Sequence, residues 1–153
     1  MVDRFTSAPL ELPELGAEEA AGFRADLIFY GVDHSGSSFQ ARVYLDAPRA
    51  DASSGRDDPR YAGAFHVFGH GGCFGDEGHC DVPSEPGDPF DLELPHPLTP
   101  QTKVVDITEA LRAHVDVTKP DQSVRVTVVA ETVRDRPNDV LAFETVRLAF
   151  YVP

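Results

Sequence analysis

The segment 61–80 constrains the fold most, because a strand-like pattern runs directly into a glycine-rich loop. Tyr61, Phe65 and Val67 alternate with small or polar residues, which is typical of a strand with one buried face. Five glycines then fall within residues 69–78, and so permissive a backbone does not continue a regular strand. The segment therefore predicts a β-scaffold that presents an irregular loop.

The same alternation recurs along the chain and sets the expected fold class. In the segment 38–46, Phe39, Ala41 and Val43 fall on one face, and the segment 123–130 repeats the pattern with valines. We therefore predict an all-β protein, an antiparallel β-sandwich of about six to seven strands with one short helix. The expected strands are 23–32, 38–46, 61–68, 102–105, 123–130 and 141–151.

The short helix is predicted at Thr108–His114, near residues 107–113. Asp106 precedes it and is predicted to be its N-cap, with Glu109 three residues later completing a capping box. Residues 1–21 are polar, acidic and proline-containing, and are expected to form a flexible N-terminal arm. Residues 22–153 would then form the sandwich, with a Gly/His/Cys-rich loop at 69–100.

Charge and hydropathy exclude two classes of partner. The formal net charge is −13, whereas binding to nucleic acid requires clustered lysine and arginine, so we expect no nucleic-acid partner. No apolar run approaches the roughly eighteen residues of a membrane span, so no membrane insertion is expected. The first residues show no secretory signal, which predicts a cytoplasmic chain or one exported together with a partner.

A resemblance to a known family rests on the strand Tyr61-Ala-Gly-Ala-Phe65, followed by Val67 and Gly69. It resembles a strand in the C-terminal domains of type-3 copper proteins, which include tyrosinases, polyphenol oxidases and molluscan haemocyanins. The order of the flanking segments also fits, and the resemblance covers roughly residues 23–130. The long insertion 69–100 departs from the family's pattern.

The resemblance implies a function. In that family the β-sandwich is a lid that packs on the helical copper domain and places one bulky side chain over the dicopper site. Some bacterial tyrosinases have a separate helper protein that also assists copper loading. This stand-alone chain is therefore expected to be a non-catalytic partner of a tyrosinase-like copper oxidase. The alternative is a free-standing metal-binding β-sandwich protein.

The loop supplies candidate metal ligands, because thiolate and imidazole groups suit Cu(I) and Zn(II). Copper is the expected metal and zinc the alternative. The cysteine pair leaves three interpretations open: a disulfide, free thiols, or metal ligation. The candidate ligands are His66, His70, Cys73, His79 and Cys80.

The bulky side chain of a lid cannot be assigned by alignment across the insertion, so it is chosen on chemistry. Phe74 is a bare aromatic in a polar, glycine-rich loop, flanked by Cys73 and Gly75. We predict that it is the plug that enters the oxidase. Phe68 and Tyr61 are fallback candidates, but their strand pattern indicates core positions.

The sequence offers no catalytic constellation that would make the chain an enzyme. The six histidines equal the number in a dicopper site, but they are scattered rather than carried by helices. A blue-copper site needs a cysteine, two histidines and usually an axial methionine, but the only methionine is Met1 and neither cysteine is followed by a closely spaced histidine and methionine. The remaining histidines, His34, His96 and His114, are expected to be surface or hydrogen-bonded residues.

Overall fold

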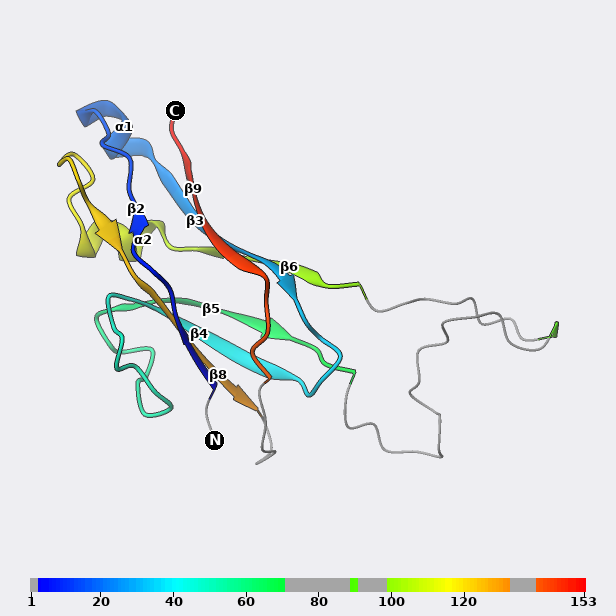
Figure 1. Ribbon diagram of the computed structural model, residues 1–153. Helices are drawn as coiled ribbons and strands as arrows, with labels where there is room; N and C mark the ends of the chain where they lie inside the picture. Colours follow the sequence, from blue (N-terminus) through cyan, green and yellow to red (C-terminus); the bar gives the residue numbers. More distant parts are fainter. Residues whose placement is uncertain (1–2, 71–88, 91–98, 133–139) are drawn as a thin grey trace.

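The computed structural model describes residues 3–70, 89–90, 99–132 and 140–153, in which two antiparallel sheets enclose one core (Figure 1). One sheet has the strand order β1-β8-β4-β5 and the other has the order β6-β3-β9, while β2 and β7 form a short two-stranded ladder. The predicted all-β sandwich is confirmed. The strands are β1 (Asp3–Thr6), β2 (Leu10–Glu11), β3 (Arg24–Val32), β4 (Phe39–Leu45), β5 (Tyr61–Val67), β6 (Gln101–Asp106), β7 (Ser123–Val124), β8 (Val126–Thr132) and β9 (Thr145–Tyr151).

The alternation in the sequence maps onto the two faces of the four-stranded sheet. On β4, the side chains of Phe39, Ala41 and Val43 are buried in the core between the sheets. Gln40 and Arg42, which lie between them, face away from this core and are only partly buried. Strand β4 pairs with β5 on one side and with β8 on the other, so its apolar face lies in the middle of the sandwich.

The N-terminal segment differs from the flexible arm that the composition predicted. Strand β1 pairs antiparallel with β8, with Phe5 opposite Val128, and β2 pairs with β7. Residues Ala17–Gly22 form the helix α1, and the Glu19 carboxylate accepts a 2.9 Å hydrogen bond from the Gly16 N–H at its start. Strand β1 is therefore an edge strand of the four-stranded sheet, and Phe5 packs from it against the core.

Helix α2 (Thr108–His114) has the predicted bounds, but its N-terminus is built differently. Ile107, not Asp106, occupies the N-cap position, and Asp106 accepts hydrogen bonds from the Thr108 N–H at 2.9 Å and the Thr108 hydroxyl at 2.6 Å. The Glu109 carboxylate does not close a capping box, since it pairs with Arg112 at 3.0 Å. Neither described helix is long and apolar enough to cross a membrane.

Replacing Asp106 by alanine is expected to lower the free energy of unfolding by about 1 kcal/mol, as for other losses of a helix N-terminal acceptor. The Thr108 hydroxyl, then the Thr108 N–H, hold the pKa of Asp106 below its ordinary value. The carboxylate therefore stabilises the fold above the unfolded pKa of about 3.9, and this contribution is lost as the pH falls through the folded pKa. Urea denaturation at neutral and acidic pH measures both effects.

The matched control is Glu109→Ala, which removes a carboxylate of the same helix turn. Its side chain is 85% exposed in an ion pair with Arg112, and such pairs contribute only a few tenths of a kcal/mol. This account of the helix start would be contradicted if both variants lost the same free energy of unfolding. It would also be contradicted if the loss in Asp106→Ala were as large at acidic pH as at neutral pH.

Candidate functional site

The candidate site lies at one end of the sandwich, where β3 and β5 finish and β6 begins (Figure 1). We call this the loop end and define it by residues 33–38, 68–70 and 99–101. The His70 N–H donates a 2.9 Å hydrogen bond to the His34 carbonyl, and the Gly69 N–H donates a 3.0 Å bond to the Ser38 hydroxyl. These bonds fix the residues after β5 against the turn after β3.

The turn after β3 is held by its own side chains. Asp33 accepts hydrogen bonds from the Ser35 N–H at 2.8 Å and from the Ser35 hydroxyl at 3.0 Å. These bonds, the backbone one foremost, hold the pKa of Asp33 below its ordinary value. At neutral pH the Asp33 carboxylate is therefore charged and accepts both hydrogen bonds from Ser35. These two bonds close the turn that carries His34.

His34 is buried at the loop end, with only 8% of its surface exposed. Its Nε2 lies 2.8 Å from the Thr99 carbonyl oxygen, and its buried Nδ1 has no hydrogen-bond partner in the described part of the chain. The His70 ring packs edge-on against it, with ring centroids 5.0 Å apart. The sequence indicated a surface or hydrogen-bonded histidine, and the structure shows a hydrogen-bonded one that is buried and beside a second histidine.

Phe68 is 80% exposed, so the core position that the sequence indicated for it is wrong. Phe65 and Val67 face the core, and the alternation of the strand turns the residue after Val67 toward solvent. Its ring lies near that of His70, with centroids 6.4 Å apart. The loop end therefore presents one bare aromatic ring beside two histidines.

Tyr61 is not on the core face either. A register shift pairs Val43 with Gly63 and Tyr44 with Tyr61, which leaves Ala62 as an extra residue on β5. One extra residue inverts the side-chain alternation, so Tyr61 packs against Tyr44 outside the main core, with ring centroids 5.8 Å apart. Of the two fallback plugs, only Phe68 is freely exposed.

The structure describes two of the predicted metal ligands, His66 and His70, and both side chains are exposed. His66 lies on β5 opposite Gln40, and His70 contacts His34. The other predicted site residues, Cys73, Phe74, His79 and Cys80, lie outside the described residues. Among those that are described, no three His, Cys, Asp or Glu side chains are grouped to hold a metal ion, so the five-residue ligand set stays a prediction.

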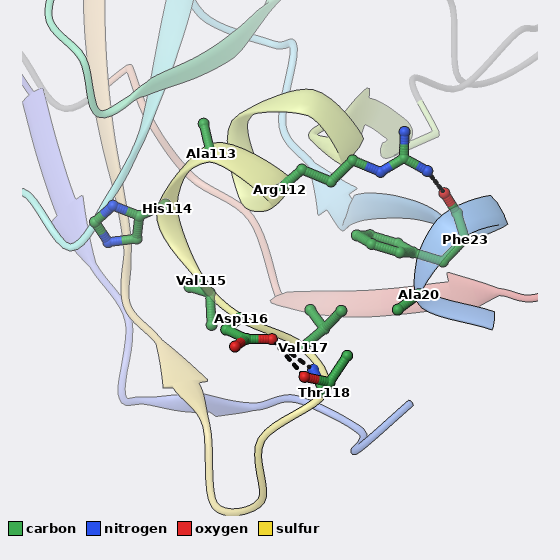
Figure 2. A pocket seen from close by; sticks show the side chains of 9 residues that line it. All are labelled: Ala20, Phe23, Arg112, Ala113, His114, Val115, Asp116, Val117 and Thr118. Atoms are coloured by element: carbon green, nitrogen blue, oxygen red, sulfur yellow. Dashed lines mark hydrogen bonds between the residues drawn. The ribbon is translucent and has the colours of Figure 1, made fainter. Parts of the chain in front are cut away.

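A hollow of about 420 Å³ lies beside helix α2 (Figure 2). Its charged groups are already engaged: Arg112 donates to the Phe23 carbonyl at 2.9 Å and packs over the Phe23 ring at 4.8 Å. At the same hollow, Asp116 accepts from Thr118, and His114 pairs with Asp46 at 2.9 Å. These interactions join α2 to its neighbours and leave this hollow without a free charged group.

The fold matches part of a latent polyphenol oxidase. Neither the protein-family models nor the curated proteins contain a match to this chain. Among solved structures, recombinantly expressed latent aurone synthase, a polyphenol oxidase, aligns with a TM-score of 0.55 at 17% identity. The alignment covers 98% of this chain and 24% of that one. The latent enzyme from its natural source gives a TM-score of 0.57, also at 17% identity, over 98% of this chain and 25% of that one.

At this identity the comparison establishes a shared fold. This chain spans about a quarter of the length of the enzymes it matches, as expected for the β-sandwich domain alone. The resemblance of the Tyr61-Ala-Gly-Ala-Phe65 strand therefore led to the correct fold.

Proposed function

We propose that this chain is a non-catalytic lid or helper subunit of a tyrosinase-like copper oxidase. In this role it covers the dicopper site of the oxidase, keeps the enzyme latent and assists copper loading. The role does not depend on whether the chain acts alone or as part of a longer protein.

The observation that carries the proposal is the unequal coverage of the structural match. Nearly all of this chain, 98%, aligns with only 24% of a latent polyphenol oxidase. A piece of that size would correspond to an accessory domain rather than a whole oxidase. In the family that the β5 sequence resembles, the sandwich domain is the lid.

The loop end supports the same role, because a lid needs an apolar group that projects from a rigid support. Phe68 is 80% exposed immediately after the paired strand β5. The long insertion that carries Phe74 begins directly after it. Aromatic side chains on such projections are the usual anchors of protein interfaces.

The proposal is tested by co-expressing the chain with the tyrosinase-like oxidase of the same organism. We expect the two proteins to co-purify, and the purified complex to oxidise diphenols more slowly than the free oxidase. The copper-loaded chain alone is expected to show no steady phenol oxidation. The proposal is wrong if the oxidase neither binds the chain nor loses activity in its presence.

Replacing Phe74 by alanine is expected to leave the complex intact but to raise its rate of diphenol oxidation by about ten-fold or more. Truncating an aromatic anchor commonly weakens its contact by about 2 kcal/mol, while the contacts around it persist. The measurement is the initial rate of the purified complex, with co-purification as the readout of binding.

Phe68→Ala is the matched comparison, since it removes the same ring from the described part of the loop end. We expect a smaller activation, because Phe68 stands at the base of the loop that carries Phe74. If only Phe68→Ala releases activity, Phe68 is the plug and the assignment of Phe74 is incorrect.

A further inference from the structure

We propose that His34 and His70 form a two-imidazole binding site for Cu(I) at the loop end. This site differs from the Cys/His set expected from the sequence, because it includes the buried His34 and needs neither cysteine. It rests on the proposed function only for its role, a place on this chain for the copper that is to be loaded. Binding itself is a property of the isolated chain.

The hydrogen bond of His34 indicates which ring nitrogen carries the hydrogen when the ring is neutral. The Thr99 carbonyl can only accept, so Nε2, at 2.8 Å from it, carries the hydrogen. In the neutral ring Nδ1 then keeps a free lone pair. That atom is buried and finds no partner among the described residues, although buried polar atoms are normally satisfied. A metal ion would satisfy it, and a carbonyl bond to the other ring nitrogen is the usual way to orient a ligating histidine.

His70 is placed to supply the second nitrogen. Its backbone is fixed by the bond from its N–H to the His34 carbonyl, and its ring lies 5.0 Å from the His34 ring, centroid to centroid. Two imidazole nitrogens on one ion, with metal–nitrogen bonds of about 2 Å each, are at most about 4 Å apart. Because the His70 side chain is exposed, its ring can rotate to reach this separation.

The number of donors favours Cu(I). Zinc sites in proteins almost always have four ligands. Cu(I), a closed-shell monovalent ion, forms stable linear complexes with two nitrogen ligands. At the loop end the Asp33 carboxylate accepts hydrogen bonds from Ser35, so among the described side chains there the two imidazoles supply the nitrogen donors. The ring of Phe68, 6.4 Å from that of His70, adds an apolar neighbour to the exposed side of the pair.

A second unsatisfied atom lies close by in the fold. The side-chain oxygen of Gln101, at the start of β6, is buried and likewise without a described partner. Gln101 lies opposite Val32, two residues before His34. Two of the three such atoms in the described part of the chain thus belong to the loop end, as expected of a surface completed by a ligand or partner.

The test is an anaerobic titration of the purified chain with Cu(I) against a chromophoric Cu(I) chelator. It is carried out in the Cys73→Ser/Cys80→Ser variant, so that no thiolate contributes. We expect one Cu(I) per chain, and a loss of affinity of at least ten-fold on His70→Ala. Because His70 is exposed, this variant should fold normally, which circular dichroism checks. His34→Gln, at the buried partner, should weaken binding similarly.

His66→Ala is the control, since it removes an exposed histidine from the adjacent strand and should leave the affinity unchanged. The proposal is overturned if the cysteine-free chain does not bind Cu(I), if His70→Ala binds as tightly as its parent, or if the pair takes up Zn(II) but not Cu(I). These outcomes are independent of the lid role, which is judged by binding to the oxidase.

Discussion

Replacing Phe29 by alanine is expected to lower the free energy of unfolding by about 3–5 kcal/mol, the usual range for a large aromatic core residue. Phe29 lies on β3, has no exposed surface and contacts the Phe65 ring of the opposite sheet at 4.9 Å between centroids. It also meets Phe143 edge-on at 5.3 Å. The alanine would therefore leave a cavity between the two sheets, and urea denaturation followed by circular dichroism measures the loss.

Phe68→Ala provides the control for this prediction, because it removes an identical side chain that is 80% exposed. Its effect on stability is expected to be within about 0.5 kcal/mol. Comparable losses in both variants would mean that the cavity between the sheets is not the cause. The same variant separates two roles of phenylalanine in this chain, since Phe29 is buried in the core and Phe68 is exposed where we propose that a partner binds.

The strands could be predicted where one face meets water and the other meets the core. On β4 and β5 the buried residues Phe39, Ala41, Phe65 and Val67 follow this rule. Strand β9 (Thr145–Tyr151) starts four residues later than predicted, since Leu141 belongs to the segment before it, where its N–H donates to Asp3 at 3.0 Å. That bond joins the two ends of the chain, and no local pattern predicts it.

The outer face of the four-stranded sheet could not be predicted from alternation. Tyr44 lies between the core residues Val43 and Leu45, yet it is fully buried on the opposite face. The polar segment 46–60 folds back over it, and the Tyr44 hydroxyl donates to the Ser54 carbonyl at 2.5 Å. Arg42 reaches the same segment and donates to the Ala52 carbonyl at 3.0 Å. The loop is held on the sheet by its backbone carbonyls, which accept these hydrogen bonds. Its side chains are mostly polar, so its sequence shows no hydrophobic pattern from which its position over the sheet could be predicted.

The candidate site was predicted only in part, for a related reason. The sequence indicated the strand before the glycine-rich loop and the histidines within it. It did not indicate His34, which precedes His70 by 36 positions and joins it through the bond between the His70 N–H and the His34 carbonyl. Phe68 was assigned to the core because an apolar residue at a strand end has the same local pattern whether it is buried or bare.

The glycine of the Tyr61-Ala-Gly-Ala-Phe65 strand has a structural reason that the sequence could not reveal. Gly63 has a φ of 151°, a conformation that side-chain-bearing residues rarely adopt. It also lies where β5 of one sheet approaches β6 of the other, and a Cβ atom there would be 2.5 Å from Cγ1 of Val105. Val105 is buried and β-branched, so it has little freedom to move aside.

We therefore expect Gly63→Ala to lower the free energy of unfolding by about 2–4 kcal/mol, from backbone strain and over-packing together. The matched control is Gly36→Ala, since a Cβ atom at Gly36 meets nothing within 4 Å, and its effect should be within about 0.5 kcal/mol. Chemical denaturation of both variants measures the difference. Equal free energies of unfolding would mean that the two sheets can move apart at this point without destabilising the fold. The close approach of β5 to Val105 would then not be the reason for a glycine at this position.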